Sequence, residues 1–372
     1  MAAAFPGRLV AILALLHAYI GVRLLAPFGP DVRWAGAAAL AASLWLLPKG
    51  FRMARRLGPR KLLLRWGTVG FFSWLLLLTL ARDAGLVVAG LLLEPSAHAA
   101  WTRGSAIGAI ATTAVVTIVG YLMARRVASV VDVEVPVAGL APQLEGFTIA
   151  QISDLHVGPT IRRRFVEKVV ERVNRLEADM VAITGDLVDG SVTELAVHTQ
   201  PLAALRSRHG TYVVTGNHEY YSGVHGWVRE LRRLGTRVLL NEHVVIDHDG
   251  AALAVAGVTD YAAHHFDPAH ESDPVAAAEG APPGALKLLL AHQPRSAPLA
   301  ARAGFDLQLS GHTHGGQFWP WNLLVRLQQP FTAGLNRLGR MWVYINRGTG
   351  YWGPPMRFGI PSEITLIRLV SE

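Results

Sequence analysis

The chain divides into two parts that differ in how apolar and polar residues alternate. Up to about residue 125, long apolar runs carry almost no charge, whereas after Val131 short apolar runs alternate with amphipathic segments. A helix that crosses a bilayer needs about 20 mostly apolar residues, while a buried strand needs only about five. We therefore predict a helical membrane anchor over residues 1–130 and a separate domain over residues 131–372.

Four stretches of the first part qualify, or nearly qualify, as membrane spans. They cover residues 9–26, 34–47, 62–80 and 106–123. The second is short, and the third carries Arg65 near its start, where a long basic side chain can reach the interface. The apolar residues 84–93 are too few to cross alone, so we expect them to extend or cap the third helix. A cleaved signal peptide would explain the first stretch only, which favours a multi-pass anchor.

The basic residues of the anchor predict its orientation. Residues 1–130 hold 14 Lys/Arg against 3 Asp/Glu, and residues 131–372 hold 21 against 24, so their net charges are +11 and −3. Basic loops are retained on the cytoplasmic side. With four spans, the two main basic clusters share one side of the membrane with Arg8. The cluster between the second and third spans comprises Lys49, Arg52, Arg55, Arg56, Arg60 and Lys61, and the cluster after the fourth span comprises Arg125 and Arg126. We therefore expect an integral protein of the cell membrane whose second domain is cytoplasmic. An odd number of spans would place that domain on the opposite side of the membrane.

Composition excludes two classes of function. The basic surplus lies wholly in the apolar part, so the sequence pI of about 10.1 reflects loops beside a bilayer. We therefore expect no nucleic-acid binding through a basic face. The chain has no cysteine, which excludes disulfides and thiolate chemistry.

The second part alternates strand-like and helix-like segments before a run of strands. Strands are expected at 147–152, 180–184, 211–215, 238–240, 243–247, 253–258, 286–291, 307–309, 342–345 and 364–369. Helices are expected at 161–176, 202–208 and 224–234. This order predicts an α/β domain in which paired β-sheets are flanked by helices, an αββα arrangement.

Metal-ligand residue types recur just after these strands. They are Asp154, His156, Asp186, Asp189, Asn217, His218, His292, His312 and His314. A single histidine in such a place is most often a turn or core residue, but α/β folds gather active-site groups at strand ends. Carboxylates, imidazoles and one amide suit Mn, Fe or Zn better than calcium, which prefers oxygen ligands. The set exceeds what one ion needs, so we expect two divalent ions that hold a bridging hydroxide for attack on a phosphoester.

The blocks that carry these residues resemble the motif set of the calcineurin-like metallophosphoesterases. They read Asp-Leu-His at 154–156, Gly-Asp-Leu-Val-Asp at 185–189, Gly-Asn-His-Glu at 216–219, Ala-His-Gln at 291–293 and Gly-His-Thr-His at 311–314. The resemblance implies one metal held by Asp154, His156, Asp186 and His314, and a second held by Asp186, Asn217, His292 and His312. It also implies that His218 is the catalytic histidine, oriented by Asp189. Glu219 would support the site, lie at the surface or cap a helix.

Three further blocks are similar to the membrane-anchored subgroup of this family, which includes bacterial membrane phosphodiesterases and transmembrane proteins with a metallophosphoesterase domain. They are the extension to Gln317, Asn-Arg-Gly-Thr-Gly at 346–350 and Pro-Ser-Glu at 361–363. The resemblance implies hydrolysis of a phosphodiester, phosphomonoester or pyrophosphate. A membrane enzyme would meet a phospholipid or a lipid-linked substrate such as UDP-diacylglucosamine. The alternative is a catalytically silent membrane scaffold or sensor that binds metal and phosphate.

Three segments permit two interpretations each. Aromatic residues crowd 318–342, which is either a lipid-facing lip or an insertion that covers the core. The segment 261–284, with His264, His265 and His270, is favoured as a solvated loop over a third metal site. The arginine run at 162–164 either contacts anionic groups or is the solvated start of a helix.

Overall fold

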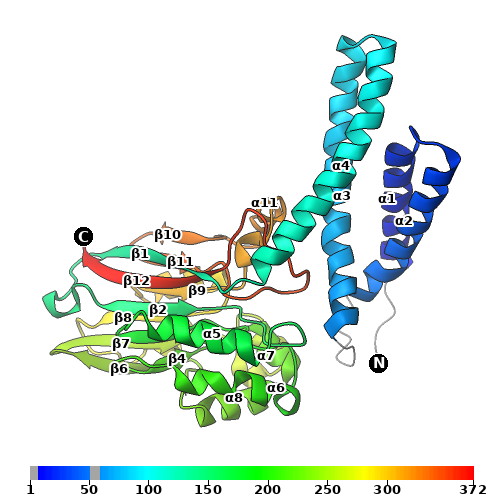
Figure 1. Cartoon of the computed structure of the whole chain (residues 1–372). Coiled ribbons are helices and arrows are strands. Elements are labelled where there is room, and N and C mark those ends of the chain that lie inside the picture. Colours follow the sequence, from blue (N-terminus) through cyan, green and yellow to red (C-terminus); the bar gives the residue numbers. More distant parts are fainter. Residues whose placement is uncertain (1–6, 51–58) are drawn as a thin grey trace. The chain divides into compact units, whose positions relative to one another are not determined.

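The computed structural model describes residues 7–50 and 59–372 (Figure 1). The basic residues Arg52, Arg55 and Arg56 lie outside this range. The chain forms two compact units. The first comprises Met1–Arg125 with Gly353–Met356, and the second comprises Arg126–Trp352 with Arg357–Glu372.

The described part of the first unit contains four helices. They are α1 (Gly7–Leu25), α2 (Pro30–Gly50), α3 (Pro59–Leu92) and α4 (Pro95–Ala124). The last three begin at a proline, whose fixed φ suits the first turn of a helix and whose missing N–H costs nothing there. Within the described residues, three segments are long and apolar enough to cross a membrane: Gly7–Leu25, Lys61–Leu92 and Pro95–Ala124. The chain is therefore a membrane protein with three candidate spans, and α2 is not among them.

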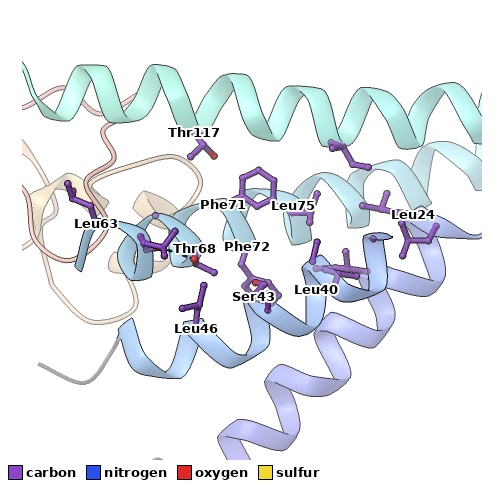
Figure 2. Close-up of a pocket in the computed structure, with 18 residues that line it drawn as sticks. Leu24, Leu40, Ser43, Leu46, Leu63, Thr68, Phe71, Phe72, Leu75 and Thr117 are labelled. Atoms are coloured by element: carbon purple, nitrogen blue, oxygen red, sulfur yellow. Dashed lines mark hydrogen bonds between the residues drawn. The ribbon is translucent and has the colours of Figure 1, made fainter. Parts of the chain in front are cut away.

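Residues 84–93 behave as expected, because α3 continues to Leu92 before the turn into α4. Within the unit, His17 of α1 lies 3.0 Å from the Ser43 hydroxyl of α2 and stacks on Phe72 of α3. A cavity of about 700 Å³ opens among the four helices, and its lining is almost wholly apolar, including Leu40 and Phe71 (Figure 2). Polar contacts and apolar packing thus join α1, α2 and α3.

The second unit contains two mixed six-stranded sheets. The first has the order β1-β12-β2-β3-β4-β5 and the second the order β10-β11-β9-β8-β7-β6. The strands of the first are β1 (Ser129–Val137), β2 (Thr148–Ile152), β3 (Met180–Ile183), β4 (Thr211–Val213), β5 (Arg237–Val238) and β12 (Glu363–Ser371). Those of the second are β6 (Glu242–His248), β7 (Ala251–Gly257), β8 (Leu286–Leu290), β9 (Leu307–Ser310), β10 (Gly334–Leu338) and β11 (Met341–Ile345).

Helices cover these sheets. They are α5 (Arg163–Asn174), α6 (Val192–Thr199), α7 (Asn217–Ser222), α8 (Val224–Arg233), α9 (Pro274–Ala278), α10 (Ala297–Arg302) and α11 (Trp321–Val325). In Figure 1, α5, α6 and α8 lie together along one side of the domain. Short 3₁₀ turns fill several connections, among them η2 (Gln200–Ala204), η4 (Pro268–His270) and η6 (His314–Gly316).

The two faces of each central strand pack into different cores. In β2 and β3, Ile149 and Met180 point into the core shared by both sheets, whereas Ala150 and Val181 point to the core beneath the helices α5 and α8. Strands buried on both faces are apolar throughout, which explains why these segments read as continuous apolar runs. The expectation of paired sheets flanked by helices is met.

The helix expected at 202–208 is wrong. The segment is instead the 3₁₀ turn Gln200–Ala204, and the backbone is extended at Leu205, which ends the turn. Leu202 of this turn is buried in the core beneath the helices α5 and α8, so packing against distant residues, and not the local apolar pattern, determines the backbone here. The edge strands β1 and β10 were not expected from the sequence. Edge strands are half exposed, and β1 accordingly carries Asp132, Glu134 and Pro136 among its apolar residues.

Candidate active site

The ends of five strands deliver the residues singled out from the sequence. Asp154 and His156 follow β2, Asp186 and Asp189 follow β3, and Asn217 and His218 open α7 just after β4. His292 follows β8, while His312 and His314 follow β9. The two sheets therefore contribute to one place in the second unit.

Asp154, His156 and His314 form a first group whose ligand atoms all lie within 4.8 Å of one another. His314 Nε2 lies 3.1 Å from His156 Nε2 and 3.3 Å from Asp154 Oδ1. All three side chains are buried. His156 Nδ1 donates to the Asp189 carboxylate, so its Nε2 presents a lone pair to the group.

Asp186, His292 and His312 form a second group of the same size. His292 Nε2 lies 3.1 Å from Asp186 Oδ2 and 3.2 Å from His312 Nδ1. His292 Nδ1 donates to the Thr184 carbonyl oxygen at 2.7 Å, which leaves its Nε2 as the free nitrogen. Asp186 Oδ2 also lies 3.8 Å from His156 Nε2, so this carboxylate faces both groups.

These residues fit a pair of cations. Acceptor nitrogens that approach one another to 3.1 or 3.2 Å repel unless a proton or a metal ion lies between them. Asn217 Oδ1 is buried and has no hydrogen-bond partner among the described residues, as expected for an oxygen directed at an ion. The donor set of imidazoles, carboxylates and one amide suits Mn, Fe or Zn.

The backbone around the two groups is strained. Five of the residues have positive φ: Asp154 (52°), His156 (50°), Asp186 (51°), His312 (68°) and His314 (52°). Residues other than glycine rarely adopt this region, and they do so at about 1–3 kcal/mol each mostly where function demands it. Two motif glycines permit the crowding: a Cβ on Gly216 would lie 2.2 Å from Asp186 Oδ1, and one on Gly311 would lie 2.2 Å from Asp154 Oδ2.

His218 adjoins both groups through its neighbour Asp189. His218 Nδ1 lies 2.6 Å from Asp189 Oδ1, and its Nε2 lies 3.9 Å from Asp186 Oδ2. In the metal-free protein, burial lowers the pKa of His218, but Asp186 and Asp189 outweigh it and raise the pKa to about 9. Burial raises the pKa of Asp189, whereas His156 and His218 together hold it well below its usual range.

Glu219 does not lie at the surface, and it caps α7 by accepting from the Gly216 N–H. It is buried, and its carboxylate accepts from the backbone N–H groups of Asp186, Leu187, Val188 and Gly216. Glu219 therefore connects the loop after β3 to the first turn of α7. Glu219 thus caps the helix and also supports the loop that carries Asp186, whereas the surface position is wrong.

Sequence reasoning missed Arg357. This side chain is fully buried, donates to the carbonyl oxygens of His314 and Arg347, and lies 3.1 Å from His314 Nδ1. The residue belongs to none of the motif blocks, so no local signal distinguished it from the many other arginines.

The aromatic segment 318–342 contains side chains that cover the core and side chains that are exposed. Phe318 is buried, whereas Phe331 and Trp342 pack against the cores of the second sheet. Trp319 and Trp321 are exposed at 44% and 41%. The segment therefore covers the core and also presents indole rings to the surroundings.

The arginines at 162–164 lie where α5 begins. Arg163 pairs with Glu167 at 2.7 Å on the exposed side of that helix, and Arg162 donates to the Pro159 carbonyl oxygen. This placement matches the solvated start of a helix.

Comparison with known proteins identifies the family that this domain resembles. Residues 147–316 match the model of the calcineurin-like phosphoesterases. The chain is 41% identical over 296 residues to the transmembrane protein with metallophosphoesterase domain of Bos taurus, covering 73% of this chain and 66% of that protein. It is 41% identical to an uncharacterized metallophosphoesterase of Helicobacter pylori, covering 60% of each. It is 34% identical to one of Aquifex aeolicus, covering 60% of this chain and 85% of that protein. The match thus spans less than two thirds of the first two relatives.

Proposed function

This chain belongs to the calcineurin-like metallophosphoesterases, which are hydrolases, and we propose that it cleaves a phosphoester of a membrane lipid or lipid-linked molecule at a two-ion centre. The observation that carries this proposal is the pair of ligand groups that meet at Asp186. The bond cleaved is a phosphodiester, phosphomonoester or pyrophosphate.

The proposed ligands follow the two groups. One ion is held by Asp154, His156, Asp186 and His314, and the other by Asp186, Asn217, His292 and His312. When bound, the ions activate water and offset the charge of the phosphate. Asp186 faces both groups, and its negative charge reduces the repulsion between two cations.

His218 serves as the proton donor in this proposal. Asp189 accepts from Nδ1 and fixes the orientation of the ring, so Nε2 is the nitrogen that faces the substrate. In the metal-free protein Asp186 and Asp189 raise the pKa of His218 to about 9, and the contact with Asp189 favours the protonated imidazole. The ring can therefore protonate the leaving oxygen, a contribution of about 10²- to 10⁴-fold in rate.

A lipid substrate is supported by the surface beside the site. The helix α11 follows the His-Thr-His-Gly-Gly block directly, and a Cβ on Gly316 would lie 2.1 Å from the Asn322 Cα, so the two segments are in close contact. Trp321, Leu323 and Leu324 of α11 are exposed, as are Trp319 before it and Leu327 after it. An apolar surface of this kind inserts favourably into the headgroup region of a bilayer.

We place the catalytic domain on the cytoplasmic side, with all four helices crossing the bilayer. The helix α2 has 21 residues, which at about 1.5 Å per residue suffices to span about 30 Å of hydrocarbon. The basic clusters before α3 and after α4 then share one side. A reporter fused after Glu372 that is active only outside the cytoplasm would contradict this topology.

The test uses the purified full chain in detergent with Mn²⁺. An aryl phosphodiester reports any phosphoesterase activity, because its product is coloured and requires no lipid recognition. A scaffold or sensor would bind the ions and give no turnover. A panel of a glycerophospholipid, a nucleotide-linked lipid and their water-soluble headgroup analogues then identifies the substrate class; preference for the analogues would contradict a lipid substrate.

A further inference from the structure

A second cluster of metal-binding residue types lies apart from the two groups described above. His225, Asp267 and His270 each offer one ligand atom, and these atoms lie within 4.8 Å of one another. His225 is the second residue of α8, whereas the other two lie in the connection between β7 and β8. His264 and His265 of that connection do not belong to the cluster.

We propose that these three side chains bind a zinc ion that fastens the connection after β7 to α8. Asp267 Oδ2 lies 3.2 Å from His225 Nε2 and 3.9 Å from His270 Nε2. Ligands at about 2.0–2.1 Å from a tetrahedral zinc ion lie about 3.3 Å apart. The first distance matches this spacing, and the second requires a shift of about half an ångström.

The other polar atoms of Asp267 and His270 are already engaged, which directs the remaining ones at the ion. Asp267 Oδ1 accepts from the Ala269 N–H at 3.0 Å, leaving Oδ2 for the two imidazoles. His270 Nδ1 lies 2.8 Å from the Tyr220 hydroxyl, so Nε2 is the nitrogen that faces Asp267. Metal-bound histidines are commonly held in this way through their second nitrogen. Two imidazoles and one carboxylate leave a fourth position for water.

The ion would act on the wall of the active site. Phe266 precedes Asp267, and its ring lies 5.4 Å from that of Tyr221. The Tyr221 ring in turn lies 5.2 Å from that of His218. Zinc that joins Asp267 and His270 to α8 therefore restrains the aromatic side chains next to the proposed proton donor.

The test counts bound zinc in the full chain rather than turnover. The protein is purified in detergent, stripped with a chelator and dialysed against Zn²⁺. We expect the His225→Ala variant to bind one ion fewer per chain than the wild type, because His225 is 64% exposed at its side chain and its loss should not unfold the domain. The matched control is His264→Ala, which removes a histidine of the same connection that is outside the cluster and should bind as many ions as the wild type.

Two further measurements separate this site from the two-ion centre. The Asp186→Ala variant, which loses the carboxylate that faces both groups, should lose both ions of the two-ion centre and keep the ion at His225, Asp267 and His270. Added Co²⁺ should then give this variant the visible absorption of a four-coordinate ion, and His225→Ala in the same background should abolish it. Equal zinc content in wild type and His225→Ala would overturn the proposal, as would equal loss in His264→Ala. Both results are independent of whether the protein hydrolyses a phosphoester.

Discussion

The Asp189 carboxylate lies 2.6 Å from His218 Nδ1 through its Oδ1 atom. The same oxygen accepts from Nδ1 of His156 at 2.9 Å. One atom thus orients the proposed proton donor and one of the proposed metal ligands. The two tasks of the site, holding ions and moving a proton, are coupled through this oxygen.

Asp189→Asn should therefore impair both tasks. An amide can accept through one oxygen only and carries no charge, so both imidazoles lose their anionic partner. Changes of this kind next to a metal ligand typically cost about 10- to 100-fold in metal affinity or activity. Metal titration and aryl phosphodiester turnover measure the two effects. Asp249→Asn, which removes an exposed carboxylate, is the control; a loss of turnover with unchanged metal affinity in Asp189→Asn would show that His156 does not depend on Asp189.

Asp186→Ala should remove both ions and all turnover. Its carboxylate faces His292 at 3.1 Å and His156 at 3.8 Å, so each group loses its shared anion. Elemental analysis of the purified variant gives the ion count. If two ions remain bound, Asp186 does not bridge them.

Glu219→Ala should lower stability more than activity per folded molecule. Four backbone N–H groups lose their acceptor in a buried place, and unsatisfied buried donors cost about 1–3 kcal/mol each before relaxation or water entry. We expect the free energy of unfolding to fall by roughly 3 kcal/mol. Thermal unfolding of the variant provides the measurement. Glu167→Gln breaks an exposed helix pair and should cost at most about 1 kcal/mol; an equally small effect in Glu219→Ala would contradict the assigned role.

Replacing Trp319 and Trp321 together with Ser should impair lipid substrates selectively. Loss of about 2 kcal/mol of apolar contact with a bilayer corresponds to about 30-fold in kcat/KM. Turnover of the soluble aryl phosphodiester should stay within twofold or so of the wild type, about the effect of a distant surface change. The control Val197→Ser removes an exposed apolar side chain of α6. Equal loss on both substrates would mean that the indoles pack within the domain.

Local motifs explain why the sequence predicted so much of the site. Each block holds its residues next to a strand end. Because β2, β3 and β4 are parallel neighbours, Asp154, Asp186 and Asn217 lie at one edge of the sheet, and this placement can be predicted without knowing any contact between distant segments. The left-handed backbone at these positions was not predictable, since it arises from the crowding of two sheets.

Contacts between distant segments account for what the sequence did not reveal. Arg357 acts on His314 across 43 residues, and His225 meets Asp267 across 42. Neither pair has a spacing that suggests contact. The 3₁₀ turn at Gln200–Ala204 has the same origin, because its apolar residues fit a helix or a buried turn equally well until their packing is known.

The measurement that tests the central claim most directly compares wild type with His218→Asn. Both proteins are loaded with Mn²⁺ and assayed with an aryl phosphodiester, and their bound ions are counted. We predict that the variant binds as many ions per chain as the wild type and loses about 10²- to 10⁴-fold in kcat. An absence of turnover in the wild type, or unchanged turnover in the variant, would contradict a two-ion phosphoesterase in which His218 donates the proton.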